Sequence, residues 1–402
     1  MKSKFQPYQI FVIALLAFLQ FTLILDFMIL APLGAILMPE LKIDANQFAK
    51  VVSVYAFSAG TSGFLSAGFA DRFDRKKMLL FFYVGFLVGT FLCGIAPNYS
   101  FLLMARTVTG LFGGVIGSIV FAITTDLFEF NVRGRVMGTI QTAFAASQIL
   151  GIPFTLYLAN HWGWHFPFLL VVGLGAPVIL LILFKLKPIN AHLKIRSDKS
   201  PFRHLLATVR NPRYALGLSS TALLSIGGFL IMPFSSAFSV NNLGVGLEQL
   251  PMVYLVTGLS SMFLAPLAGK LSDSWGKYKV FVVGSIITPV MVIIYTHLDR
   301  VPLHVVLIVS VLMFAGITSR MISSQALLSA VPEPAYRGSF MAIGSAIQQV
   351  SGGLAAVVAG WIVVATPSGR LENFNVLGYV MVAISPITLY LIYKIDQMVK
   401  KT

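Results

Sequence analysis

The sequence contains repeated apolar segments of about 18 residues or more, each long enough to cross the roughly 30 Å hydrocarbon core of a bilayer as a helix. Twelve such spans are predicted, at about residues 8–38, 47–70, 78–96, 100–127, 136–159, 165–186, 213–240, 248–270, 279–297, 302–330, 339–366 and 374–394. Charged residues make up only 11% of the chain, whereas a water-soluble surface needs about a quarter to a third. The chain is therefore predicted to be an all-α membrane protein with twelve transmembrane helices.

Short polar sequences between the apolar segments recur at one offset. Asp71, within GFADRFDRKK, is followed 202 residues later by Asp273, within GKLSDSWGKYK. An Arg-Gly pair that begins at Arg133 recurs 204 residues later at Arg337. The offset is half of the 402-residue chain, which indicates two copies of one unit and predicts two six-helix bundles related by pseudo-two-fold symmetry. The predicted domains are an N-terminal bundle of residues 1–186, a cytoplasmic linker of residues 187–212 and a C-terminal bundle of residues 213–402.

Basic residues concentrate in alternate connections between the spans. Twelve crossings place every second connection on the same side of the membrane. One set of connections contains only Lys42, Lys50, Arg300 and Arg370, whereas the other set, with both termini and the linker, contains nearly all of the remaining Lys and Arg. Because basic connections stay in the cytoplasm, we expect a multi-pass protein of the cell (inner) membrane with both termini cytoplasmic. This asymmetry explains the net charge of +15 without a nucleic-acid partner.

The linker has a helical pattern of its own. Phe202, Leu205, Leu206 and Val209 recur at helical spacing, with basic residues on the other face. This pattern predicts a short amphipathic helix in the headgroup layer. A tether between the two bundles is its expected role.

Asp26 and Arg106 place opposite charges deep within two predicted spans. Asp26 lies roughly 24 Å along a helix that starts near Ile10, and Arg106 lies roughly 9 Å along a helix that starts near Ser100 from the other side. The depths overlap, so an ion pair or a water-bridged pair is feasible. Charges within a bilayer are costly and mark functional sites by default. We interpret Asp26 as a proton site tuned by Arg106; a static brace between two helices is the alternative.

Aromatic and methionine side chains predominate around the predicted central cavity. Such walls suit a lipophilic or cationic molecule, although these side chains also pack against lipid or neighbouring helices. Arg320 has no carboxylate at its depth; it can bind an anionic substrate group, bond a carbonyl oxygen or extend to the interface. The predicted cavity residues are Phe18, Gln20, Met28, Phe112, Phe121, Phe229, Met232, Phe234, Met313, Phe314, Arg320 and Gln348.

Motifs typical of enzymes are missing from the sequence. It has no Gly-x-Ser-x-Gly, no His-Glu-x-x-His and no Gly-Lys-Ser/Thr phosphate loop, which argues against an intramembrane enzyme and against ATP-driven pumping. Cys93 is the single cysteine, so no disulfide framework exists. We expect no enzymatic activity, no cofactor and no metal site.

The polar sequence GFADRFDRKK and its degenerate copy GKLSDSWGKYK resemble the loop signature of the major facilitator superfamily. Arg106 and Gly110, four residues apart, resemble a motif of its proton-coupled members. The resemblance covers the whole chain and is strongest to the twelve-helix drug:proton antiporter branch. It implies parallel repeats about an axis along the membrane normal.

The same resemblance implies two sites. An acid on the first helix followed by a proline, as in Asp26 and Pro32, is expected to serve proton coupling together with Arg106. The polar loop is expected to form a cytoplasmic gate or latch that holds the halves together when the cavity faces outward. The residues assigned to this latch are Gly68, Asp71, Arg72, Arg75, Asp126 and Asp273.

These features predict a secondary active transporter, a proton-coupled exporter (antiporter) of lipophilic or amphipathic small molecules that works as a monomer by alternating access. Its partners are the small-molecule substrate, protons and the lipid bilayer. The main alternative is an importer or exporter of sugars, organic acids or siderophore-like anions on the same fold, and sodium is the alternative coupling ion. A non-transporting receptor or scaffold fits less well, because it has no need of charges within the spans.

Overall fold

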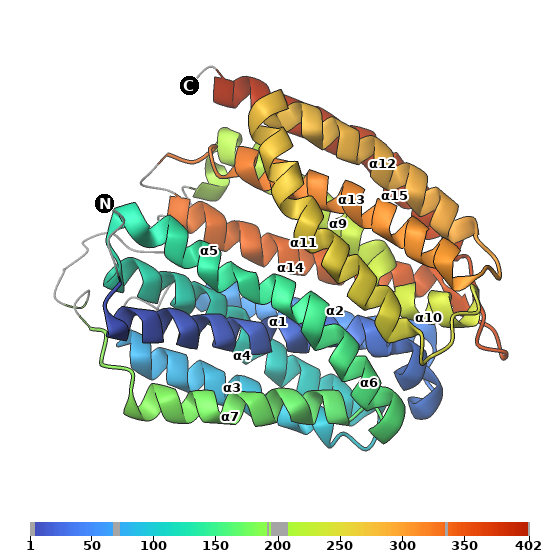
Figure 1. The fold of residues 1–402 in the computed structure, drawn as a ribbon, viewed down its shortest axis with the longest axis horizontal. Coiled ribbons are helices and arrows are strands. Elements are labelled where there is room, and N and C mark those ends of the chain that lie inside the picture. Colours follow the sequence, from blue (N-terminus) through green and yellow to red (C-terminus); the bar gives the residue numbers. More distant parts are fainter. Residues whose placement is uncertain (1–4, 67–72, 191–192, 194–207, 334–336, 401–402) are drawn as a thin grey trace.

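The computed structural model describes residues 5–66, 73–190, 193, 208–333 and 337–400, nearly all of them helical (Figure 1). The N-terminal half contains α1 (Pro7–Leu41), α2 (Ala45–Ser66), α3 (Arg75–Gly94), α4 (Tyr99–Leu127), α5 (Phe130–Ala146), α6 (Ile152–Trp162) and α7 (Phe166–Phe184). The C-terminal half contains α9 (Pro212–Ile231), α10 (Ser235–Asn241), α11 (Leu250–Trp275), α12 (Lys277–His297), α13 (Leu303–Leu328), α14 (Arg337–Ile362) and α15 (Phe374–Lys400). A two-stranded antiparallel hairpin, β1 (Val364–Ala365) and β2 (Leu371–Glu372), links the last two helices.

Eleven helical segments of the described chain are long and apolar enough to cross a membrane, with α5–α6 and α9–α10 counted as one segment each. The predicted span at residues 47–70 corresponds to α2, which has 22 residues and is therefore about 33 Å long. α2 contains Lys50 and many small or polar residues, and it falls short of the apolar composition of the others. Because α2 packs against both α4 and α14, protein rather than lipid covers much of its surface.

Two of the predicted spans are broken near the middle. A π turn, Ser147–Gly151, joins α5 to α6, and a 3₁₀ turn, Met232–Phe234, joins α9 to α10. Pro153 lies in the first turn of α6, and Pro233 lies within the 3₁₀ turn. At each position the missing N–H group prevents an ordinary α-helical bond to the preceding turn. Gly258 of α11 lies against the backbone of the π turn, so this irregular segment is also a contact between the halves.

The helices α1–α7 and α9–α15 form two groups that lie one above the other in Figure 1, with both chain ends on the same side. We call this side the terminal end and the opposite side the distal end. The groups meet along α2 and α14, at the contact of α11 with the π turn and α6, and at the contact of α1 with α10. The domain limits 1–186, 187–212 and 213–402 stay a prediction. Most of the predicted linker helix lies outside the described residues.

Hydrogen bonds between the two groups lie toward the distal end. Ser236 Oγ donates to the carbonyl oxygen of Ala31 at 2.7 Å, and Asn160 Nδ2 donates to the carbonyl oxygen of Leu247 at 2.8 Å. Within the described part of the chain, no hydrogen bond joins the groups at the terminal end. The structure is therefore closed at its distal end.

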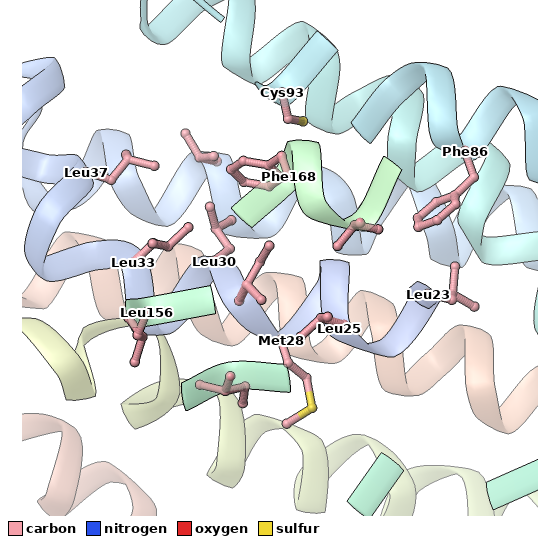
Figure 2. Close-up of a cluster of buried hydrophobic side chains, with 14 of the residues drawn as sticks. Leu23, Leu25, Met28, Leu30, Leu33, Leu37, Phe86, Cys93, Leu156 and Phe168 are labelled. Carbon is pink, nitrogen blue, oxygen red and sulfur yellow. The ribbon is translucent and has the colours of Figure 1, made fainter. Parts of the chain in front are cut away.

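α1 runs through the interior of the N-terminal group. Figure 2 shows its leucines and Met28 among Phe86 and Cys93 of α3, Leu156 of α6 and Phe168 of α7, all of them buried. Any polar side chain on this part of α1 is therefore surrounded by protein.

Glycines on α4 allow its backbone to approach α2. A methyl group at Gly110 would lie 2.5 Å from the carbonyl oxygen of Tyr55, and one at Gly114 would overlap the carbonyl oxygen of Ala59. Gly117, one turn further along α4, has no neighbour within 4 Å of the same position. The α2–α4 contact thus depends on two particular glycines.

We expect Gly114→Ala to lower the free energy of unfolding by about 1–3 kcal/mol, because the helices must separate to admit the methyl group. Gly117→Ala is the matched control, and it should be neutral or slightly stabilising because alanine favours helix. Thermal unfolding of the two purified variants in one detergent measures the difference. Equal melting temperatures would show that the α2–α4 contact is not tight.

Candidate functional site

Asp26 and Arg106 form an ion pair inside the N-terminal group. Arg106 Nη1 donates to Asp26 Oδ2 at 2.9 Å, and Thr90 Oγ1 donates to Asp26 Oδ1 at 3.1 Å. Asp26 has no exposed surface and Arg106 is 1% exposed. The carboxylate therefore connects α1, α3 and α4, and the attraction within the pair is little screened by solvent or salt.

The guanidinium of Arg106 also lies over an aromatic ring of α2. Its Cζ atom is 4.3 Å from the centre of the Tyr55 ring, a distance at which the ring face attracts a cation. The Nε–H group of Arg106 is buried and has no hydrogen-bond partner among the described residues. Arg106 thus keeps an unused donor beside its ion pair.

A buried ion pair is costly to form, and removing one of its charges is more costly still, because the other charge stays buried without a partner. Adding a proton to Asp26 would leave Arg106 as a buried charge without a charged partner. The protonation of Asp26 is therefore coupled to any change that brings a new anion, dipole or water to Arg106.

Arg106 also borders a small cavity between the two helix groups. Phe27 lies beside it, with its ring centre 5.5 Å from that of Tyr55 and 5.9 Å from that of Phe229 on α9. Arg106 supplies the only charge of the lining, and the other walls are apolar. The residues that line the cavity are Phe27, Leu30, Ala31, Val52 and Arg106 from the N-terminal group and Phe229, Met232 and Pro233 from the C-terminal group.

Two of the predicted cavity residues, Phe229 and Met232, line this cavity. Phe234 lies close by, fully buried, with its ring centre 5.9 Å from that of Phe48 in the distal closure. Met28, on the helix that carries Asp26, is buried in the core (Figure 2).

The other predicted cavity residues lie elsewhere. Phe18 is 41% exposed and borders an apolar pocket formed with α6, α7 and the π turn. Phe112 covers Gly85 of α3. Helical spacing alone cannot distinguish the side of a helix that faces the cavity from the side that faces a neighbour, and this is why the set is dispersed. Of the rest, Phe121 and Gln348 are exposed, Gln20 and Phe314 are half-buried, and Met313 is buried.

Arg320 lies between α13 and α12, away from the cavity beside Arg106. Its Cγ atom would be 3.0 Å from a methyl group at Gly284, and its Cζ atom is 5.9 Å from the centre of the Phe281 ring. Only 7% of the residue is exposed. The structure thus places this charge inside the C-terminal group.

One ion pair of the predicted latch is present at the terminal end. Arg75 Nε lies 3.2 Å from Asp126 Oδ2, which joins the start of α3 to the end of α4. Asp74 accepts hydrogen bonds from the backbone N–H groups of Lys76 and Lys77 in the first turn of α3 and caps that helix. Asp273 is exposed and has no ion pair within the described chain. Gly68, Asp71 and Arg72 lie outside the described residues.

Sequence reasoning missed the neutral partners of the ion pair. Thr90, Tyr55 and Phe27 carry no charge, and each belongs to a different helix. Asp26 and Arg106 could be selected from the sequence because a charge in an apolar span is rare, whereas a threonine, a tyrosine or a phenylalanine is not.

Eleven candidate membrane spans in the described chain, with an ion pair enclosed among the helices of the N-terminal group, are typical of a membrane transporter. The sequence pattern of the Major Facilitator Superfamily matches residues 16–356 and 217–397, and the chain belongs to this family. A solved structure supports the fold. A bacterial homologue of the human lysosomal transporter Spinster, in an inward-facing and unoccupied conformation, superposes with a TM-score of 0.79 over 99% of both chains at 15% identity.

Curated relatives are transporters as well. The chain is 27% identical over 265 residues to the uncharacterized MFS-type transporter YceJ of Bacillus subtilis (strain 168), covering 65% of this chain and 67% of YceJ. It is 29% identical over 244 residues to the multidrug resistance protein MdtG of Klebsiella pneumoniae (strain 342), covering 60% of this chain and 58% of MdtG. The chain is therefore a transporter of the Major Facilitator Superfamily.

We expect Arg106→Gln to lower the free energy of unfolding by about 3–5 kcal/mol, because it leaves the Asp26 carboxylate buried without its partner. The double variant with Asp26→Asn should recover much of this loss. Thermal unfolding of both single variants and of the double variant gives the coupling energy.

The exposed pair Arg370–Asp299, with side chains 55% and 68% exposed, provides the control. Arg370→Gln should cost about 0–1 kcal/mol. If Arg106→Gln costs no more than Arg370→Gln, the ion pair contributes nothing to the fold.

Proposed function

We propose that the protein is a proton-coupled exporter (antiporter) of lipophilic or amphipathic small molecules. The observation that carries the proposal is the position of Arg106, which pairs with a fully buried acid and also borders a cavity between the two halves. The cavity has a volume of about 10 Å³ in this conformation, room for about one water molecule. A substrate that entered it after rocking of the halves had enlarged it would meet the same guanidinium that pairs with Asp26. Proton binding and substrate binding therefore influence each other through Arg106.

The walls of the cavity favour a lipophilic substrate. Phe27, Phe229 and Met232 supply aromatic faces and a thioether, and methionine adapts to ligands of different shape while aromatic faces attract cations. The name of the relative MdtG, a multidrug resistance protein, agrees with this substrate class. Sugars and organic acids need more hydrogen-bonding groups than this lining offers.

Alternating access would proceed by rocking of residues 1–186 against residues 213–402. The basic connections assign the terminal end to the cytoplasm, so the closed distal end corresponds to an inward-facing state. When the terminal end closes, the latch around Arg75 and Asp126 would approach the start of α14. One chain supplies both walls of the cavity, so a monomer is sufficient.

Proton movement in proteoliposomes with an imposed pH gradient tests the proposal. Lipophilic cations, neutral antibiotics, sugars and siderophore-like anions are added in turn to wild type, to Asp26→Asn and to the control Glu248→Gln, which removes an exposed carboxylate. We expect lipophilic cations to discharge the gradient in wild type and in the control, with a loss of 100-fold or more in Asp26→Asn.

Two outcomes would contradict this proposal. Equal discharge by Asp26→Asn and wild type would make Asp26 a structural residue. If only sugars or anions discharge the gradient, the substrates belong to the alternative class and not to the lipophilic compounds.

The orientation can be tested separately, because Cys93 is the single cysteine and is buried. In a Cys93→Ala background, Lys187→Cys at the terminal end should be labelled by a membrane-impermeant maleimide only after the cells are opened. Ser368→Cys, in the distal hairpin, should be labelled in intact cells. The reverse pattern would invert the assignment of both ends.

A further inference from the structure

Arg320 is a buried cation without a counter-charge. No carboxylate of the described residues lies within ion-pair distance of it, and its guanidinium makes no hydrogen bond to them. The Phe281 ring, 5.9 Å away, attracts a cation only weakly at that distance. A guanidinium offers five N–H donors, and no described residue accepts a hydrogen bond from any of them. A charge in such a place requires an anion or strongly held water.

Two serine hydroxyls near Arg320 are also buried and unpartnered. Ser323 lies one turn along α13 from Arg320, and Ser285 follows Gly284, the residue of α12 against which Arg320 packs. Ser323 has no exposed surface and Ser285 is 3% exposed. Neither Oγ atom has a hydrogen-bond partner among the described residues, although buried hydroxyls nearly always have one. Three groups able to donate a hydrogen bond are thus left unused where α12 packs against α13.

Arg320 lies nearer to the terminal end of α13 than to its distal end. Arg320 lies eight residues before the end of α13 at Leu328, which corresponds to roughly 12 Å. Lys277 and Lys279 are the basic residues at the nearby start of α12, and clustered basic residues raise the local concentration of anions. Only 7% of Arg320 is exposed, which favours a small ion over a lipid headgroup as its partner.

We propose that Arg320, assisted by Ser285 and Ser323, binds a small monovalent anion such as chloride inside the C-terminal group. The guanidinium supplies the charge, and the two hydroxyls complete the shell of donors. The bound anion stabilises the packing of α12 against α13. This site is separate from the Asp26–Arg106 pair, and its occupancy does not depend on the coupling of transport to protons.

Thermal unfolding in nanodiscs of zwitterionic lipid tests the proposal, because no anionic headgroup is then present. Chloride is titrated against gluconate, an anion too large for the site, at constant ionic strength. A ligand that binds only the folded protein raises the melting temperature progressively with its concentration. We expect a rise of several degrees in wild type, no rise in Arg320→Gln and a reduced rise in Ser285→Ala.

Arg300→Gln is the matched control, because Arg300 is exposed at the distal end and its loss leaves Arg320 in place. It should respond to chloride as wild type does. Arg320→Gln should also unfold at a higher temperature than wild type in gluconate, since it removes an uncompensated charge. The same response to chloride in wild type and in Arg320→Gln, or no response in either, would show that water alone occupies the space.

Discussion

The buried ion pair between Asp26 and Arg106 determines how the helices of the N-terminal half are arranged. Asp26 and Arg106 can stay charged only while they remain 2.9 Å apart, and this distance fixes the register of α1 against α4. Thr90 of α3 donates a hydrogen bond to the carboxylate, and the ring of Tyr55 on α2 lies against the guanidinium. The close approach of α2 and α4 at Gly110 brings that ring under the guanidinium. Four helices are thus positioned around one neutral pair of charges.

The two halves share a fold but not their chemistry. The offset of 202–204 residues that relates the polar loops places the counterpart of Asp26 at residues 228–230. Phe229 lies in that interval and lines the cavity. The second copy of the unit therefore presents an aromatic wall near the position where the first copy carries an acid. In the C-terminal half Arg320 is a buried charge, but it packs against Gly284 of α12 rather than beside the cavity.

The fold was largely predictable from the sequence, because a bilayer permits few solutions: apolar runs must be helices, and their number and the charges between them set the topology. Asp26 and Arg106 could be identified as candidate site residues from the sequence because charges within membrane spans are costly and rare. The cavity walls were not predictable, since phenylalanines at helical spacing occur on every side of these helices. Phe112 fills the space over Gly85, whereas Phe27, beside the acid, was overlooked. Pro153 and Pro233 mark the places of the breaks in the fifth and seventh spans, but the sequence does not show that the π turn also packs against Gly258 of the other half.

The composition of α2 has a consequence for how the chain is made. A helix with Lys50 and many small polar residues partitions weakly into lipid by itself, so its stay in the bilayer depends on protein neighbours. α4 is synthesised soon afterwards and covers one side. The other side packs against α14, which begins at Arg337 and leaves the ribosome only when most of the chain has been translated. Until α14 is synthesised, the side of α2 that it covers has no such partner, so the N-terminal half is incomplete without the C-terminal half.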